Sequence, residues 1–154
     1  MTDAAALRIT VAGASQVPAL SDLLSTLFAQ EAEFVPNHAA QCRGLSLIIE
    51  NPSIGHLLVA HAGERAIGMV GLLYTISTAL GARVALLEDM VVAPTHRGAG
   101  IGSGLLRHAI AHARSQGCAR VTLLTDETNS GAQRFYARHG FVSSPMKPLR
   151  LLLD

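Results

Sequence analysis

Hydrophobic residues recur every three or four positions in four stretches of the chain, the spacing of one buried helix face. We therefore predict helices over residues 15–28, 39–50, 100–117 and 129–139. Ser15 is the expected cap of the first helix, whose first turn contains Pro18. The last two predicted helices end at Gly117 and Gly140, a residue type that favours helix C-termini.

Shorter stretches alternate between hydrophobic and polar residues or are continuously hydrophobic, which is typical of strands. They predict strands over residues 7–11, 56–61, 66–76, 83–92, 120–125 and 149–153. Tight turns at residues 63–65 and 79–81 join three of these strands into hairpins. The order β-α-α-β-β-β-α-β-α-β mixes hairpins with one crossover, so the fold class is α+β, or mixed α/β, and not doubly wound. No stretch has the composition of a linker, so we expect a single domain over residues 1–154.

The composition is that of a folded protein without a strongly charged surface. Of the 154 residues 49% are hydrophobic and 15% are charged, and the formal net charge is +1. No basic block suggests a nucleic-acid partner, and the hydrophobic runs are too short and interrupted to cross a membrane. The first residues lack the pattern of a secretory signal. We therefore expect a cytoplasmic protein with neither a nucleic-acid nor a membrane partner.

The cysteines and histidines form no recognisable disulfide framework or metal motif. Cys42 and Cys118 are too few and too far apart in the sequence, so we expect two reduced thiols. His108 and His112 have the i,i+4 spacing that can hold a metal, but the intervening glutamate of the zinc-protease motif is missing. We interpret them as part of a solvent-exposed helix face, and we predict no metal.

Residues 97–102, RGAGIG, carry the strongest functional signal in the chain. They follow the hydrophobic run 90–92 and precede a predicted helix. A strand, a glycine turn and a helix start in this order bring several backbone N–H groups together, and the helix dipole adds partial positive charge there. Glycine allows close approach of the backbone to a phosphate and positive φ angles. The segment therefore predicts a diphosphate-binding turn.

The spacing of the glycines excludes two nucleotide-binding motifs. A dinucleotide-binding turn needs glycines at relative positions 1, 3 and 6, and no glycine of this turn has another five residues later. A P-loop needs Gly-Lys-Ser/Thr, whereas the only lysine is Lys147. A turn that merely caps a helix would carry the entropy cost of three glycines in five residues without a ligand to offset it. Coenzyme A is the diphosphate that this spacing favours.

The turn resembles the Arg/Gln-x-x-Gly-x-Gly/Ala motif of the GNAT superfamily of N-acetyltransferases. Residues 87–94 resemble the central strand of that family, and residues 129–141 resemble its second acyl-CoA motif. The resemblance covers residues 84–141. It implies a GNAT-like fold, in which a central mixed, mostly antiparallel sheet is flanked by about four helices, and it implies acetyl-CoA as co-substrate.

The resemblance also implies which residues bind acetyl-CoA. Backbone N–H groups of the turn would hold the diphosphate, with Arg97 adding positive charge. In this family the central strand splays from its neighbour, so that its backbone can pair with the pantetheine amides, and an N–H near Met90 would face the acetyl oxygen. Asn129 caps its helix and is a further cofactor contact. The expected cofactor-binding residues are Met90, Val91, Val92, Arg97, Gly98, Ala99, Gly100, Ile101, Gly102, Ser103 and Asn129.

Two residues are the expected catalytic pair. Tyr136 occupies the family position from which a hydroxyl reaches the coenzyme A sulfur as general acid, whereas the adjacent Phe135 is interpreted as a core aromatic. Glu88 occupies the position at which small-amine acetyltransferases of the family carry a glutamate, so it is the expected base. Asp89 follows it and, by the alternation of a strand, is expected on the opposite face. Pairing with an arginine or satisfying a helix end is the alternative for either carboxylate.

The function implied by this resemblance is direct transfer of an acetyl group from acetyl-CoA to the primary amine of a small molecule in a ternary complex. Glu31 and Glu33, between the first two predicted helices, would favour a cationic amine there, although loop charges are usually only solvated. A non-catalytic acyl-CoA sensor or regulatory module, and an enzyme that acetylates a protein N-terminus or lysine, stay open. Dimerisation is common in the family, with the last predicted strand as a place for it, although no residue requires a homodimer.

Overall fold

The computed structural model describes residues 7–31 and 33–154. The chain forms two compact units, Met1–Leu124 and Thr125–Asp154. The first contains a sheet and three described α-helices, and the second contains one helix and the C-terminal segment. The expectation of one domain over residues 1–154 stays a prediction.

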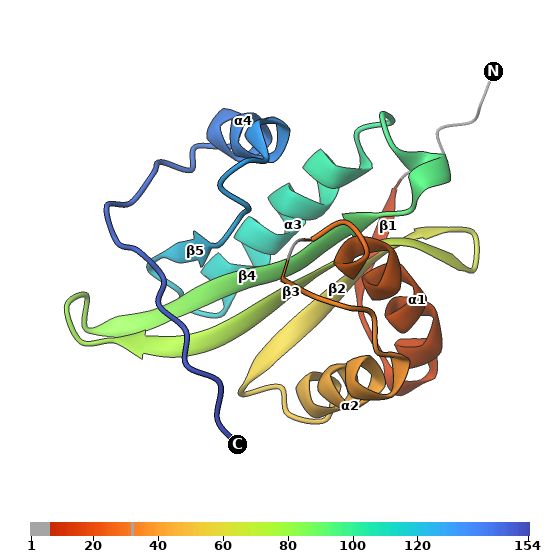
Figure 1. Ribbon diagram of the computed structural model, residues 1–154, viewed down its shortest axis with the longest axis horizontal. Coiled ribbons are helices and arrows are strands. Elements are labelled where there is room, and N and C mark those ends of the chain that lie inside the picture. Colours follow the sequence, from red (N-terminus) through yellow and green to blue (C-terminus); the bar gives the residue numbers. More distant parts are fainter. Residues whose placement is uncertain (1–6, 32) are drawn as a thin grey trace. The chain divides into compact units, whose positions relative to one another are not determined.

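Five strands form one sheet in the order β1-β2-β3-β4-β5 (Figure 1). The strands are β1 (Arg8–Val11), β2 (Gly55–Ala62), β3 (Arg65–Ser77), β4 (Ala82–Val92) and β5 (Val121–Leu123). Neighbours from β1 to β4 are antiparallel, and β5 pairs with β4 in parallel. The mixed, mostly antiparallel sheet expected from the sequence is therefore confirmed.

The four predicted helices are present, with small differences at their ends. They are α1 (Val17–Phe28), α2 (His38–Ile49), α3 (Ile101–Ser115) and α4 (Ser130–Arg138). Ser15 was the wrong cap for the first helix, because it lies inside a preceding 3-10 turn, Ala14–Gln16, and Gln16 is the N-cap. None of the helices in the described residues is both long and hydrophobic enough to span a membrane.

Helices cover both faces of the sheet. Met69 of β3 belongs to the core cluster that contains Leu20 and Leu24 of α1. The adjacent Gly68 faces α3, since a Cβ built on Gly68 would lie 2.9 Å from Cδ1 of Leu105. Consecutive residues of a strand point to opposite faces, so α3 covers the face opposite α1 and α2 (Figure 1). Complete burial of a leucine such as Leu105 contributes roughly 1.5–3 kcal/mol.

The second unit consists of α4 and a segment without regular secondary structure. Asn129 caps α4, because its side chain accepts a hydrogen bond from the N–H of Ala132 at 3.0 Å, as the sequence predicted. Gly140 follows the helix with φ 92°, a left-handed conformation that favours glycine at a helix end.

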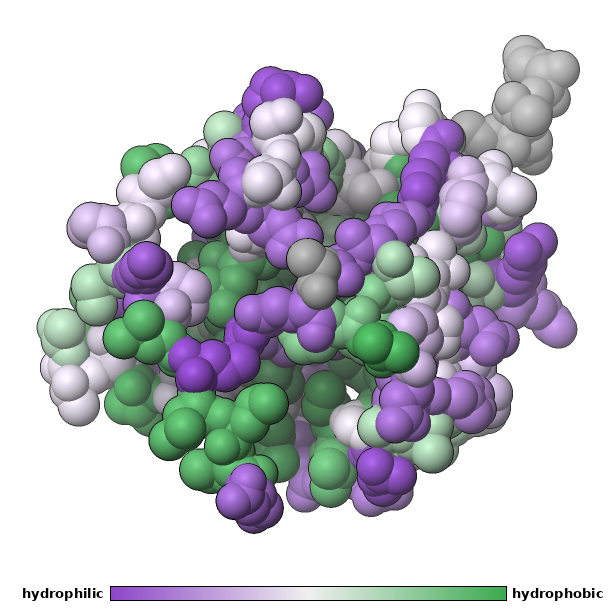
Figure 2. Space-filling view, in the orientation of Figure 1, coloured by the Kyte–Doolittle hydropathy of each residue, from purple (hydrophilic) through white to green (hydrophobic). Residues whose placement is uncertain are grey.

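The predicted strand over residues 149–153 is wrong. Residues 141–154 contain neither helix nor strand, and Leu149 is 90% exposed. Figure 2 shows hydrophobic side chains at the surface along this C-terminal segment. A strand needs a partner for its backbone groups, and the two prolines that precede the segment, Pro145 and Pro148, each lack an N–H donor. Hydrophobic character alone therefore did not identify a strand here.

Candidate functional site

One extra residue interrupts the pairing of β3 with β4. Gly71 pairs with Glu88, and Met69 pairs with Val91. One residue lies between the paired residues on β3, whereas two residues lie between them on β4. Of these two residues, Asp89 has φ 58°, and it alone among the described non-glycine residues has a positive φ. This is a β-bulge, a device that bends a strand and redirects its side chains.

Beyond the bulge, β4 also loses its other neighbour. The parallel pairing with β5 covers residues 85–87 of β4 and stops where Leu87 faces Leu123. Residues 88–92 continue along β3, but on the opposite edge no strand of the described residues pairs with them. The predicted cofactor-binding residues Met90, Val91 and Val92 lie in this stretch. Backbone groups at such an edge can pair with the amides of an extended ligand.

The glycine turn connects this edge to the start of α3. After a 3-10 turn over Pro94–His96, Gly98 has φ 82° and Gly100, the N-cap of α3, has φ 79°. A Cβ added to either glycine would meet nothing within 4 Å. Backbone conformation, and not lack of space, is therefore what requires glycine at both positions.

The first turn of α3 carries the features of an anion site. It has neither a side-chain cap nor an acidic residue, and the first backbone bond within the helix runs from Gly104 to Gly100 at 3.1 Å. The N–H groups of a first helical turn have no acceptor within the helix, and the helix dipole favours negative charge there. Ile101 is buried and fixes the turn, whereas Ala99 is exposed beside it. The predicted Gly102 and Ser103 are the next residues of α3.

Arg97 ties the turn to the end of β4. Its Nε donates a hydrogen bond to the carbonyl oxygen of Val92 at 3.2 Å. The side chain therefore folds back along the strand while remaining exposed. This bond fixes the distance between the β4 edge and the glycine turn.

Three carboxylates gather at the bulge. Burial, followed by the negative charges of Glu88 and Glu31, raises the pKa of Asp89 to about 7. Glu88 is exposed, and Glu31 is half-buried in the segment after α1. Regular alternation of side-chain direction is interrupted at a bulge, so the expectation that Glu88 and Asp89 lie on opposite faces stays a prediction. A carboxyl that titrates near neutral pH can accept a proton from another group at that pH.

Partial burial of Asp89 is the property that sequence analysis missed. A strand pattern assigns faces by alternation, and alternation does not reveal an extra residue. The available signal was the pair of adjacent carboxylates within LLEDMVV, since two acidic residues are costly inside a hydrophobic strand. Glu33, the second acidic residue expected over the acceptor, is exposed and is not among the groups that raise the pKa of Asp89.

Tyr136 lies in the second unit, on α4. Its ring packs at about right angles against Phe135 and Phe141, with centroids 5.2 Å and 5.7 Å apart. The backbone N–H of Phe141 donates to the carbonyl oxygen of Tyr136 at 3.1 Å. This small aromatic cluster holds the Tyr136 side chain relative to α4. Its role as general acid stays a prediction.

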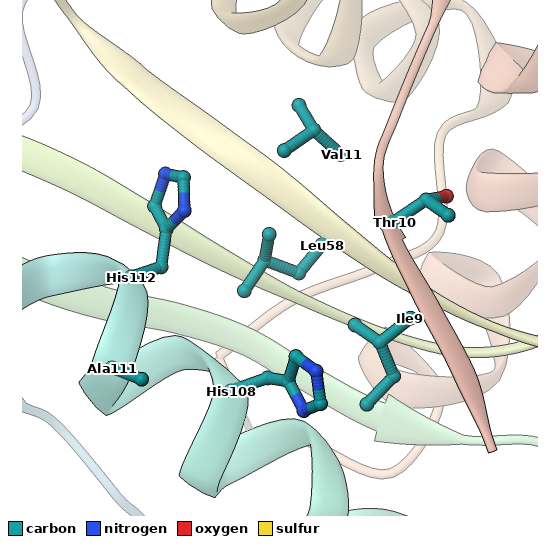
Figure 3. A pocket seen from close by; sticks show the side chains of 7 residues that line it. All are labelled: Ile9, Thr10, Val11, Leu58, His108, Ala111 and His112. Carbon is teal, nitrogen blue, oxygen red and sulfur yellow. The ribbon is translucent and has the colours of Figure 1, made fainter. Parts of the chain in front are cut away.

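A separate hollow of about 310 Å³ lies between α3 and the β1–β2 edge of the sheet. The imidazoles of His108 and His112 project from α3 toward this hollow, beside Ile9 and Leu58 (Figure 3). The interpretation of both histidines as a solvent-exposed face is wrong for His112. Its buried Nε2 has no hydrogen-bond partner among the residues that the structure describes, and its ring packs edge-on against His56. No group of three or more metal-ligating side chains occurs in residues 7–31 and 33–154.

Comparison with known proteins identifies the family and the fold of the chain. The family model described as "Acetyltransferase (GNAT) family" matches residues 18–141. The chain belongs to the GNAT acetyltransferase family. A putative acetyltransferase from Agrobacterium tumefaciens shares the fold, with a TM-score of 0.80 and 25% identity over 94% of this chain and 99% of that one.

Two curated GNAT-type relatives have named substrates. Streptothricin acetyltransferase of Streptomyces lavendulae is 46% identical over 55 residues, which are 36% of this chain and 29% of that protein. Aminoalkylphosphonate N-acetyltransferase of Salmonella typhimurium is 31% identical over 101 residues, 66% of this chain and 65% of that protein. The chain spans only about a third of the length of the first curated relatives that it matches.

We expect the Asp89 carboxyl to titrate with a midpoint near pH 7, which ¹³C NMR of labelled aspartate can measure. Glu88→Gln should lower this midpoint by removing a neighbouring charge, but should leave it above the ordinary value of 3.8, because burial is the largest cause. Glu64→Gln, in the exposed β2–β3 turn, is the control and should leave it unchanged. A wild-type midpoint near 4 would contradict the raised pKa of the half-buried Asp89.

Proposed function

We propose that this protein transfers the acetyl group of acetyl-CoA to the primary amine of a small molecule. One observation carries the proposal. The glycine turn at the uncapped start of α3 directly follows the edge of β4 that lacks a strand partner among the described residues. Asp89, whose pKa is raised to about 7, lies at the same edge. Family membership supports the same reaction class.

The donor groups at this edge fit the chemistry of coenzyme A. The backbone N–H groups of residues 98–103 would hold the diphosphate, because the turn offers donors and a helix dipole without a competing carboxylate in the first helical turn. The backbone of residues 90–92 would pair with the pantetheine amides, and a backbone N–H near Met90 would stabilise negative charge on the acetyl oxygen. When bound, acetyl-CoA supplies an activated acyl group as a thioester.

We assign acceptance of the amine proton to Asp89. An amine must lose its proton before it can attack a thioester, and a base with a pKa about 7 is both available and effective at neutral pH. Glu88, the base expected from the sequence, then stabilises the positive charge of the incoming ammonium together with Glu31. Tyr136 keeps its expected role, in which its hydroxyl donates a proton to the departing thiolate.

The acceptor is a small cationic amine in this proposal. Glu31 and Glu88 place negative charge around Asp89, which favours an ammonium over a neutral or anionic group. The relatives named for streptothricin and aminoalkylphosphonates have small molecules in their names, which supports the small size of the acceptor but not its net charge. A cytoplasmic location and a homodimer stay predictions.

Binding of acetyl-CoA can be tested separately from catalysis. Gly100→Ala should weaken binding at least tenfold in calorimetry, because it opposes the backbone conformation that presents the N–H groups of the turn. Gly117→Ala, at the other end of α3, is a matched control with the same φ of 79° and the same absence of neighbours within 4 Å. Both variants should lose a similar stability, about 1–2 kcal/mol, but only Gly100→Ala should lose affinity.

A thiol-release assay then tests transfer with 2-aminoethylphosphonate, a streptothricin, spermidine and a lysine-containing peptide. Release with a small amine but not with the peptide is the expected result. No binding of acetyl-CoA by the wild-type chain would refute the proposal. Binding without thiol release would identify an acyl-CoA-binding module, and release with the peptide alone would identify a protein acetyltransferase.

Asp89→Asn should lower kcat/KM by about 10²-fold or more, because it removes the base. In the wild type, kcat/KM should rise with pH up to about 7, where Asp89 loses its proton, and this dependence should disappear in the variant. Affinity for acetyl-CoA should not change. If Asp89→Asn keeps the pH dependence while Glu88→Gln loses it, the base is Glu88.

Tyr136→Phe should lower kcat by roughly 10²-fold with little change in the affinity for acetyl-CoA, because the phenyl ring keeps the aromatic packing but cannot donate a proton. Phe135→Leu is a packing control, which should reduce stability more than kcat. Unchanged turnover of Tyr136→Phe at saturating acetyl-CoA would remove Tyr136 from the mechanism.

A further inference from the structure

Three side chains at the contact between α1 and α2 form an arrangement that acetyl transfer does not use. His38 is the first residue of α2, and Cys42 lies one turn later on the same side of that helix. The Nε2 of His38 is 3.5 Å from the Sγ of Cys42, and its Nδ1 is 2.8 Å from the Oγ of Ser21 on α1. Cys42, His38 and Ser21 therefore contact one another as a nucleophile, its base and a group that orients the base would.

The orienting hydroxyl is firmly held. Ser21 has no exposed surface. The Nε2 of Gln41 donates hydrogen bonds to the carbonyl oxygen of Ser21 at 3.0 Å and to its Oγ at 3.1 Å. The Oε1 of Gln41 in turn accepts from the backbone N–H of Asn37 at 2.7 Å. Because this network fixes Ser21, the hydroxyl also fixes the orientation of the His38 ring.

The same geometry suits a charged thiolate–imidazolium pair. When His38 takes a proton, Nδ1–H can donate to Ser21 Oγ while Nε2–H donates to the sulfur, so both donors have acceptors. His38 is exposed and Cys42 is half-buried, which leaves the sulfur within reach of a small reagent. A thiolate is the reactive form of cysteine, and an adjacent imidazole increases its population.

We propose that Cys42 is a reactive thiol that exchanges with low-molecular-weight disulfides, with His38 as its base and Ser21 as the residue that positions the base. The Cys42 proton passes to His38 Nε2, and the sulfur attacks one sulfur of the disulfide. The S–S bond of the reagent breaks as a mixed disulfide forms on Cys42. The departing thiolate takes the proton back from His38, so that atoms and electrons balance.

Cys118 provides an internal control for this proposal. It is also half-buried, but it lies beyond the end of α3, near Tyr74 and Arg83. Burial raises the pKa of the Cys118 thiol, an effect that the nearby Arg83 only partly opposes. The two cysteines have similar exposure but different neighbours, so Cys118 is the reference for a thiol without an adjacent imidazole, and a substitution of His38 isolates the effect of the imidazole.

We therefore expect glutathione disulfide to react selectively with Cys42 in the full chain. Mass spectrometry can measure the rate of mixed-disulfide formation at each cysteine. At pH 7, Cys42 should react at least tenfold faster than Cys118. His38→Gln should slow Cys42 about tenfold and leave Cys118 unchanged, because glutamine offers no comparable base. His108→Gln, which removes an exposed histidine of α3, is the matched control and should change neither rate.

Rescue by an added base separates a base from a packing residue. Free imidazole should restore part of the Cys42 rate in His38→Gln and should leave the wild-type rate unchanged. Ser21→Ala should slow the reaction of Cys42 with glutathione disulfide while iodoacetamide still labels Cys42. Equal rates for the two cysteines, or a Cys42 rate that His38→Gln leaves the same or raises, would overturn the proposal.

Discussion

Asp89 holds a left-handed backbone, φ 58°, within an otherwise regular antiparallel pair, and the candidate site depends on this conformation. Such a conformation costs an ordinary residue roughly 1–2 kcal/mol, although aspartate tolerates it better than most. The extra residue redirects β4 just after its pairing with β5 ends at Leu87. The backbone of residues 88–92 thereby lies at an edge where an acidic side chain is half-buried. In the proposed function, one local distortion thus supplies both the binding edge and the base.

The position of α3 makes this edge useful, because the helix begins where β4 ends. Gly68 allows α3 to approach the sheet closely, since a Cβ there would lie 2.9 Å from Leu105 and 3.2 Å from the carbonyl oxygen of Val91. Gly104 has a similar role, because its Cβ would meet Leu7 at 2.5 Å. These contacts and the Arg97–Val92 hydrogen bond fix the glycine turn beside the strand. Close packing therefore sets the position of a glycine turn whose residues 97–100 are themselves exposed.

The sequence predicted best what depends on local pattern. The periodic residues of α3, the hairpin turns and the Asn129 cap depend on neighbours a few positions away, and all were found. The bulge at Asp89 is a matter of register between β3 and β4, which alternation within β4 does not contain. His112 likewise has a helical pattern that looks exposed until His56 of β2 is packed against it. The prediction of a strand over residues 149–153 was wrong because hydrophobic character alone does not specify a strand when no neighbouring strand pairs with it.

Charge near the base comes from the α1–α2 connection and not from the sheet alone. The connection is fixed at one end by the packing of Phe34 on Phe28, with ring centroids 5.4 Å apart, and at the other by the hydrogen bond between Asn37 and Gln41. Glu31 lies between Phe28 and Phe34 in the sequence, and its negative charge contributes to the raised pKa of Asp89. In the proposed function, a change in the charge of this segment would therefore alter which amine is favoured without changing the sequence of the bulge or the glycine turn. The proposal thus assigns acceptor preference and cofactor binding to different parts of the fold, which would allow one to vary while the other is kept.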